Sequence, residues 1–169
     1  MPIPITRAAK ACAVAAVALF ATLVAFGNLT DYDTNFAFVQ HVLSMDTIFP
    51  SSTIRWRAIS SASLHHLAYA SIIAVEIGVA ALCWIGAVQL VRRLRASRTE
   101  FERGKRPAIA GLVLGFLLWQ VGFMSVGGEW FGMWQSQTWN GVASAFRFAI
   151  TIMAVLIFVT LPDRDSPDF

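Results

Sequence analysis

The stretch RRLRASRTEFERGKR, residues 92–106, decides the fold, because it places seven basic residues between two long apolar segments. Short cytoplasmic loops of membrane proteins carry such an excess of Lys and Arg, and the loops on the opposite side do not. The stretch therefore predicts a cytoplasmic loop over residues 92–107, with a membrane-spanning segment on either side.

The composition supports a membrane protein. Hydrophobic residues make up 57% of the 169 residues and charged residues 14%, whereas soluble proteins average about 25% charged residues. A helix needs about 20 apolar residues to cross a hydrocarbon core of about 30 Å. We expect an all-α membrane protein, a four-transmembrane-helix bundle forming a single domain over residues 1–169. The expected spans are residues 8–27, 65–91, 108–127 and 141–161.

The other basic residues predict the orientation. Arg7 and Lys10 lie at the start of the first span, and Arg164 follows the fourth, so both termini are expected in the cytoplasm. Ten of the thirteen Lys and Arg then lie on that side, and the net charge of +3 reflects topology rather than a nucleic-acid partner. Residues 28–64 and 128–140 become outward loops. A cleaved signal peptide is the alternative for the first segment, although its apolar run exceeds the usual 7–15 residues.

The first outward loop has a helical pattern. It contains DYDTNFAFVQHVLSMDT from Asp31, in which Phe36, Val39 and Leu43 recur at helical spacing after an acidic N-cap candidate. We expect a short outward-facing interfacial helix that lies on the membrane surface or covers the bundle.

The second outward loop is rich in tryptophan. Its sequence GGEWFGMWQSQTWNG places Trp130, Trp134 and Trp139 within ten residues, and Trp56 adds a fourth indole on the same side. Indole rings favour the headgroup level of a bilayer, so these residues are expected either to anchor the bundle or to rim a binding surface.

These segments carry a resemblance to a known family. DYDTNFAFVQHVLSMDT, WRAI from Trp56, EWFGMWQSQTWNG from Glu129 and the Phe146–Arg147 pair resemble the bacterial "predicted small integral membrane protein" family, a four-span domain of unknown function. The resemblance covers nearly the whole chain. It implies a four-helix protein of the bacterial inner membrane and supplies no reaction, ligand or catalytic residue.

One carboxylate needs an explanation. Glu76 lies near the middle of the second span, where a carboxylate must be protonated, paired or hydrated. His65, Tyr69 and Cys83 fall on the same helix face, which is expected to point into the bundle. A structural contact between helices and a proton, ion or quinone pathway both remain open.

Arg147 is the expected partner of Glu76, with Gln120 completing an intramembrane polar cluster of Glu76, Arg147, Gln120, Tyr69 and His65. The alternative is that Arg147 turns outward to Glu129 and leaves Glu76 protonated.

The third span has a glycine stripe. Gly111, Gly115 and Gly122 align on one face, and the first two form a G-x-x-x-G motif. Gln120 lies opposite Gly111, so if Gln120 faces the cluster the stripe faces outward and receives another helix. Packing within the chain is the alternative.

Polar and aromatic residues of the outward loops are candidates for binding. They have no tight metal-ligand spacing, and Asp46 is expected to pair with Arg55 or Arg57, so no metal or cofactor is expected. No nucleophile elbow, P-loop or dinucleotide motif occurs, which makes an enzyme the less favoured class. The binding candidates are Asp33, Asn35, His41, Asp46, Arg55, Arg57, Glu129, Trp134, Gln135 and Asn140.

Three hypotheses of function follow. The first is a non-enzymatic accessory or assembly subunit that binds a protein partner, or a second copy of itself, through its outward face. The second is an oligomeric pathway for a small solute or protons that uses the Glu76–Arg147 cluster. The third is a quinone-associated or redox-associated membrane subunit that uses the same polar stripe.

Overall fold

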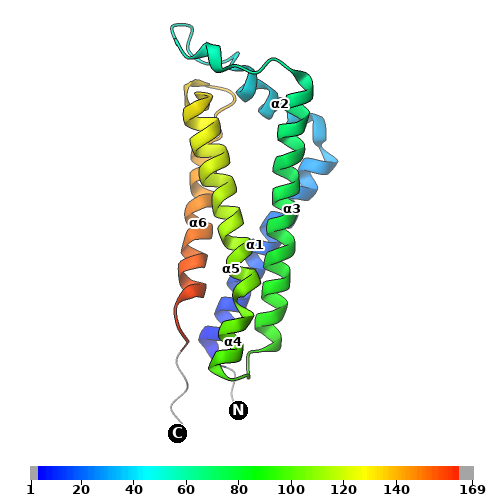
Figure 1. Ribbon diagram of the computed structural model, residues 1–169, viewed down its shortest axis with the longest axis vertical. Coiled ribbons are helices and arrows are strands. Elements are labelled where there is room, and N and C mark those ends of the chain that lie inside the picture. Colours follow the sequence, from blue (N-terminus) through cyan, green and yellow to red (C-terminus); the bar gives the residue numbers. More distant parts are fainter. Residues whose placement is uncertain (1–3, 164–169) are drawn as a thin grey trace.

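The computed structural model describes residues 4–163, and all regular structure in that range is helical (Figure 1). Four helices are long and apolar enough to cross a membrane, which confirms the predicted four-span fold. They are α1 (Ile5–Thr30), α3 (Ala62–Arg92), the third span formed by α5 (Arg106–Leu117) and η2 (Leu118–Trp130), and α6 (Val142–Thr160). Arg164, which entered the orientation argument, lies outside the described residues.

Three of the four spans extend beyond their predicted ends, and α6 lies within its predicted range of 141–161. At a rise of about 1.5 Å per residue, the 31 residues of α3 measure about 46 Å, which exceeds the hydrocarbon thickness of about 30 Å. The α1 helix continues to Thr30, three residues past its expected end. Both extensions place residues that were assigned to loops inside helices.

A cap covers one end of the bundle. The predicted interfacial helix is α2 (Tyr32–Ser44), which follows α1 after a bend at Asp31 and crosses the end of the bundle in Figure 1. Two 3₁₀ turns, η1 (Arg55–Arg57) and η3 (Met133–Gln135), complete the cap. Met45 ends α2 in the left-handed region, with φ 53°.

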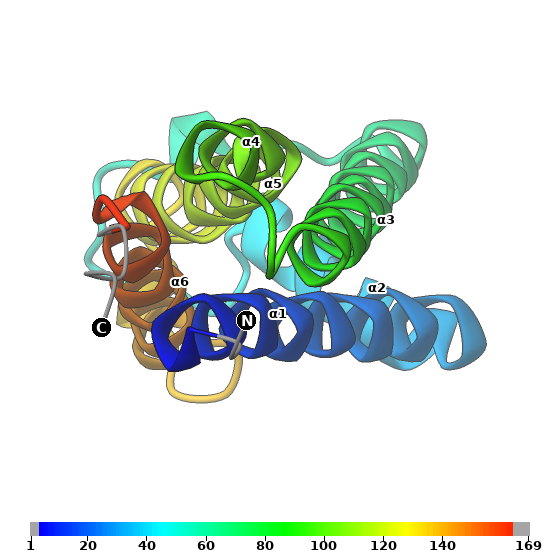
Figure 2. The ribbon, with the colours of Figure 1, turned by 90° about the horizontal axis from the view of Figure 1, so that it is seen from below.

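The α3 helix is central to the packing. It contacts α1 on one side and α5 on the other, and α6 closes the bundle against α5 and η2 (Figure 2). Small residues allow the close approach: a Cβ on Gly86 would lie 2.5 Å from the backbone nitrogen of Ala108, and one on Gly111 would lie 2.7 Å from Cys83 Sγ. Small residues serve this purpose between membrane helices, where lipid is as apolar as the packed side chains.

This packing corrects the outward glycine stripe. Gly111 and Gly115 are buried, and a Cβ on Gly115 would meet Val79 of α3 at 3.2 Å and Ile152 of α6 at 3.3 Å. Gly122 is the exception, with only its own neighbour Leu118 within 4 Å. The G-x-x-x-G motif therefore serves packing within the chain.

The third span changes its winding. From Leu118 to Trp130 it forms a π-helix, with backbone bonds such as Phe131 N–H to the Val126 carbonyl at 3.0 Å. This change of winding was not predicted from the sequence. Figure 1 shows this segment diverging from α3 toward the cap.

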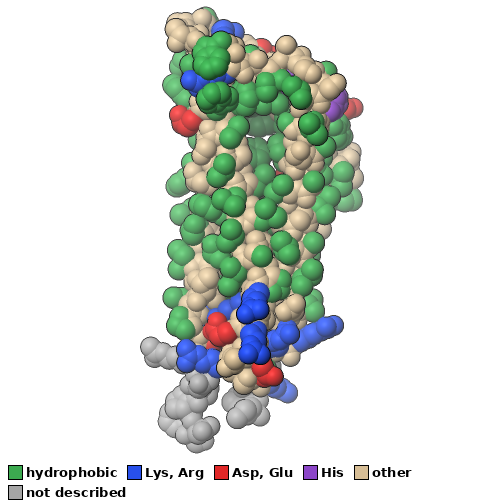
Figure 3. All heavy atoms as spheres, in the orientation of Figure 1, with side chains coloured by type: hydrophobic (Ala, Val, Ile, Leu, Met, Phe, Trp, Pro, Cys, Tyr) green, Lys and Arg blue, Asp and Glu red, His purple; other side chains and the backbone are tan. Residues whose placement is uncertain are grey.

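The basic segment lies at the end opposite the cap. Figure 3 shows Lys and Arg gathered there, below an exterior that is largely hydrophobic. The segment also contains a short helix not predicted from the sequence, α4 (Arg98–Gly104). Ser97 caps α4 through a reciprocal capping box with Glu100.

Candidate functional site

Glu76 lies on the buried face of α3. Its side chain is 2% exposed, and His65, Tyr69 and Cys83 on the same face are also buried. The expectation that this stripe points into the bundle is therefore confirmed, because these positions repeat close to whole turns of the helix.

The partner of Glu76 comes from α1. Asn28 Nδ2 donates a hydrogen bond of 2.8 Å to Glu76 Oε2, and Tyr69 Oη donates one of 3.0 Å to the Asn28 carbonyl. Sequence reasoning missed Asn28 because it ended the first span at Gly27 and assigned the next residue to a loop. The polar residue just beyond an apolar run was the available signal.

Within the described part of the chain, residues 4–163, Glu76 and Arg147 do not form the expected pair. Arg147 is exposed, and its guanidinium donates to Ser144 Oγ at 3.0 Å. The buried face of α6 carries Ala145 and Ala149, each two residues or about 200° away from Arg147 on the helix. Arg147 therefore points away from the bundle.

Gln120 does not complete the cluster either. It is half-buried in η2, and its backbone carbonyl accepts a hydrogen bond of 3.0 Å from Ser125 Oγ. Gln120 lies opposite Gly111 on the helix, and Gly111 packs against α3, so Gln120 is turned away from Glu76.

A small cavity adjoins Glu76. Residues of all four spans line it, among them Phe20, Val79, Trp119 and Ile152. Its volume of about 10 Å³ is near the minimum that one water molecule requires. The carboxylate therefore adjoins closely packed apolar side chains, and this cavity between described residues is too small to serve as a hydrated route.

The two outward loops are joined across the cap. Thr47 Oγ1 donates to Ser136 Oγ at 2.9 Å, and the Phe49 N–H donates to Gln135 Oε1 at 3.2 Å. Beneath these bonds lies a separate hydrophobic cluster of Val42, Met45, Ile48, Phe131 and Met133. The cap is thus a packed unit with its own core.

Arg57 adds a third connection within the cap. Its guanidinium lies over the rings of Trp130 and Trp56, at 4.6 Å and 5.4 Å from their centroids. The same group donates a hydrogen bond of 3.1 Å to the Trp130 carbonyl. These contacts fix two exposed indoles relative to each other.

Asp46 pairs with His41 rather than with Arg55 or Arg57. His41 Nδ1 and Asp46 Oδ2 are 2.7 Å apart, and the His41 ring stacks on Trp139 with centroids 4.5 Å apart. Arg55 instead donates to the carbonyl oxygen of Ile48. The prediction failed because the turn after α2 brings Asp46 back toward its own helix.

The remaining outward candidates differ in accessibility. Gln135 is buried, and Asn35, His41 and Arg57 are half-buried. Within residues 4–163, no three His, Cys, Asp or Glu side chains gather as a metal ion requires. The exposed candidates are Asp33, Asp46, Arg55, Glu129, Trp134 and Asn140.

A charged cluster at the basic end was missed entirely. Asp163 Oδ2 lies 3.0 Å from Lys10 Nζ and 2.6 Å from Lys105 Nζ, and all three side chains are at most 3% exposed. Glu102 also binds Lys105, at 2.8 Å. Burial opposes ionisation of Asp163, but the hydrogen bonds from Lys105 and Lys10 outweigh it and hold the pKa of Asp163 below its ordinary value.

The charged cluster joins residues that lie far apart in sequence. Lys10 belongs to α1, Lys105 precedes α5, and Asp163 follows α6. Sequence patterns record local spacing, so a lysine inside the first apolar segment was the one visible sign of a buried partner.

Comparison with known proteins identifies the chain at the level of family. A family model described as "Predicted small integral membrane protein (DUF2165)" matches residues 6–162. No curated protein and no solved structure matches the chain.

Proposed function

The chain belongs to this family of predicted small integral membrane proteins, and from that premise we propose that it is a non-enzymatic accessory or assembly subunit. In this proposal the cap binds a protein partner within a larger complex of the bacterial inner membrane. The whole chain acts as one integral membrane domain.

The charge distribution supports the proposed orientation. Seven basic residues lie between Arg92 and Arg106, whereas the cap carries only Arg55 and Arg57 among its described residues. The positive-inside rule then assigns the basic end, with both termini, to the cytoplasm and the cap to the outward side.

Exposed aromatic side chains on the cap carry the proposal. Trp56 is 73% exposed, and Trp134 is 49% exposed. Trp56 packs edge-on against Trp130, and Trp134 packs edge-on against Phe49, with ring centroids about 6 Å apart in each pair. Trp and Arg dominate the energetics of protein interfaces, and Arg55 is exposed on the same cap.

The cap is also ordered before binding. Hydrogen bonds between its two loops and the Arg57 contacts hold the aromatic pairs in place. A preformed surface loses less conformational entropy on association than a flexible loop does. Anchoring in lipid headgroups would require the indoles, but it does not require this connection between the loops.

The experiment compares two tryptophan substitutions. Trp134→Ala alters the cap, and Trp84→Ala alters an exposed tryptophan on α3, within the membrane-spanning part. Proteins that co-purify in mild detergent are quantified by mass spectrometry from cells with each variant. We expect Trp134→Ala to lower the recovery of a specific partner by about tenfold, equivalent to about 1.4 kcal/mol of binding free energy.

The control determines the interpretation. Trp84→Ala is expected to leave recovery of the same partner unchanged. Equal recovery in wild type and Trp134→Ala, with both proteins folded, would contradict binding through the cap.

A proton or small-solute pathway is the second candidate. It is favoured by one observation: Glu76 is a buried carboxylate next to a cavity that all four spans line. In this hypothesis Asn28 and Tyr69, rather than Arg147, are the polar partners of Glu76. Self-association would have to supply the hydrated route. Glu76→Gln would then abolish proton flux into liposomes while leaving partner recovery intact. Equal flux in both proteins argues against it.

The quinone hypothesis uses the same polar stripe of α3. Solvent extraction of the purified protein tests it directly, since a quinone has its own absorption spectrum. A stoichiometric quinone would favour this third function over the other two.

A further inference from the structure

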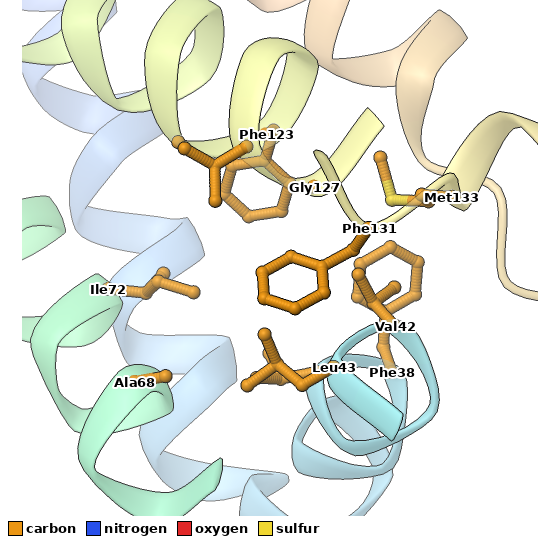
Figure 4. A pocket seen from close by; sticks show the side chains of 12 residues that line it. Phe38, Val42, Leu43, Ala68, Ile72, Phe123, Gly127, Phe131 and Met133 are labelled. Carbon is orange, nitrogen blue, oxygen red and sulfur yellow. The ribbon is translucent and has the colours of Figure 1, made fainter. Parts of the chain in front are cut away.

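An apolar pocket of about 210 Å³ opens near the cap (Figure 4). It is bounded by α2, by the outer part of α3, by η2 and by the chain that follows η2. Phe38, Leu43, Ile72, Phe123 and Phe131 supply most of the visible lining, and no charged side chain is among the lining residues.

The pocket follows from the divergence of two helices. Gly86 and Gly111 hold α3 and α5 together near the basic end. Toward the cap the helices separate, and Gly122 and Gly127 of η2 contribute no side chain to fill the space between them. The cap covers this space but does not fill it.

The pocket opens laterally, on the side of the bundle that faces lipid. Figure 3 shows a hollow beneath the cap, between α3 and the third span, in an otherwise apolar surface. Ile72 lies 20 residues before Arg92, or about 30 Å at about 1.5 Å per residue. This distance matches the thickness of the hydrocarbon core, so the opening lies at the cap-side edge of that core.

We propose that this pocket binds a segment of a phospholipid acyl chain from the cap-side leaflet. An apolar cavity of about 150 Å³ stays dry and binds a benzene-sized hydrocarbon, so a pocket of about 210 Å³ takes somewhat more hydrocarbon than one ring. Acyl chains are the most concentrated hydrocarbon beside the opening. A whole helix, at about 10 Å in diameter, is too wide for this volume.

The proposal is independent of partner binding by the cap. It names a lipid acyl chain as the ligand of the pocket. It also gives η2 a role, because Gly122 and Gly127 have no side chains and so keep the pocket open. The bound segment of acyl chain would pack against Phe131 and Met133, which belong to the core of the cap.

Photolabelling tests the proposal. The protein is reconstituted into vesicles of phosphatidylethanolamine and phosphatidylglycerol with a small fraction of phospholipid that carries a diazirine in one acyl chain. After irradiation, adducts are mapped by peptide mass spectrometry. Phe131 and Met133 are only 5% and 2% exposed, so adducts there require a chain inside the pocket, whereas Val88, at 44%, reports bulk lipid.

Two glycine substitutions form a matched pair. A Cβ on Gly122 would have only Leu118 Cδ1 nearby, at 3.7 Å, and a Cβ on Gly27 would have nothing within 4 Å. Gly122→Leu is expected to reduce adducts at Phe131 and Met133 by about tenfold, because its side chain occupies the space that the acyl chain would enter. Gly27→Leu is expected to leave them unchanged, and both variants should keep the label at Val88.

Several outcomes would overturn the proposal. Labelling of Val88 without labelling of Phe131 or Met133 in the wild type is one, and full labelling of these residues in Gly122→Leu is another. Adducts between two protein chains at Phe131 would identify a second copy as the occupant. If Gly122→Leu fails to fold, Ala68→Phe fills the same pocket from α3 and must give the same loss of label.

Discussion

Asp163→Asn removes the negative charge that joins three spans at the basic end. The substitution preserves the size of the side chain but withdraws the partner of two lysines whose side chains are 2–3% exposed. Lys105 keeps the carboxylate of Glu102 at 2.8 Å, whereas Lys10 keeps the carbonyl oxygen of Leu161 and the face of the Phe158 ring but no carboxylate among the described residues.

The expected loss follows from that geometry. Breaking a buried ion pair so that one charge lacks a partner costs about 3–5 kcal/mol. One ammonium is left without an opposite charge, so the lower end, about 3 kcal/mol, applies to Asp163→Asn. In a chain of this size each kcal/mol corresponds to about 2–4 °C in Tm, which gives a decrease of about 6–12 °C.

Thermal unfolding in a mild detergent measures this decrease, with Glu102→Gln as the matched control. Glu102 is 35% exposed, so solvent screens its charge more than that of buried Asp163, and Glu102→Gln should cost less than Asp163→Asn. Adding Lys10→Met to Asp163→Asn removes the unpaired charge and should recover part of the loss, since an apolar replacement is often neutral. Equal Tm values for Asp163→Asn and Glu102→Gln would refute the reasoning.

The pKa of Asp163 adds a prediction about pH. A carboxylate with a depressed pKa contributes stability above its unfolded pKa and loses it as the pH falls through the lower folded value. The stability difference between wild type and Asp163→Asn should therefore be constant at neutral pH and shrink only in strong acid.

Three further predictions concern packing, the arginine and α4. Gly86→Val should lower the free energy of unfolding by about 3 kcal/mol, measured by thermal unfolding, because its Cβ would lie 2.5 Å from the Ala108 nitrogen. Gly27→Val, with open space around its Cβ, should lower it by less than about 1 kcal/mol. Equal losses in the two variants would contradict the close contact at Gly86. Arg147→Gln should change stability by less than about 0.5 kcal/mol, and a loss of several kcal/mol would instead indicate a buried ion pair. Ser97→Ala should destabilise α4 by about 1 kcal/mol, seen as faster amide exchange confined to that helix, and unchanged exchange would argue against the capping box.

The sequence predicted the parts of the fold that depend on apolar runs. The four spans, the helix over residues 32–44 and the buried stripe of Glu76 all follow from hydrophobic length and period, which a single chain records directly. The helix ends were less accurate, because polar residues such as Asn28 continue a helix once its partners are in place.

The candidate site was harder to predict, since pairing depends on direction as well as depth. The α6 helix turns Arg147 away from the bundle, and its guanidinium donates to Ser144 instead of Glu76. Gly111 rather than Gln120 faces α3, and no local pattern in the sequence predicts which side of an apolar span faces the bundle. The Lys10–Asp163 contact spans 153 residues, so only the folded chain reveals it.

Photocrosslinking at position 134 in living cells tests the central claim most directly. A photoreactive amino acid replaces Trp134 in one experiment and Trp84, within the membrane-spanning part of α3, in the other. Binding through the cap predicts one discrete protein adduct at position 134 and lipid adducts at position 84. Lipid adducts alone at both positions would contradict it and would leave the cap tryptophans as membrane anchors.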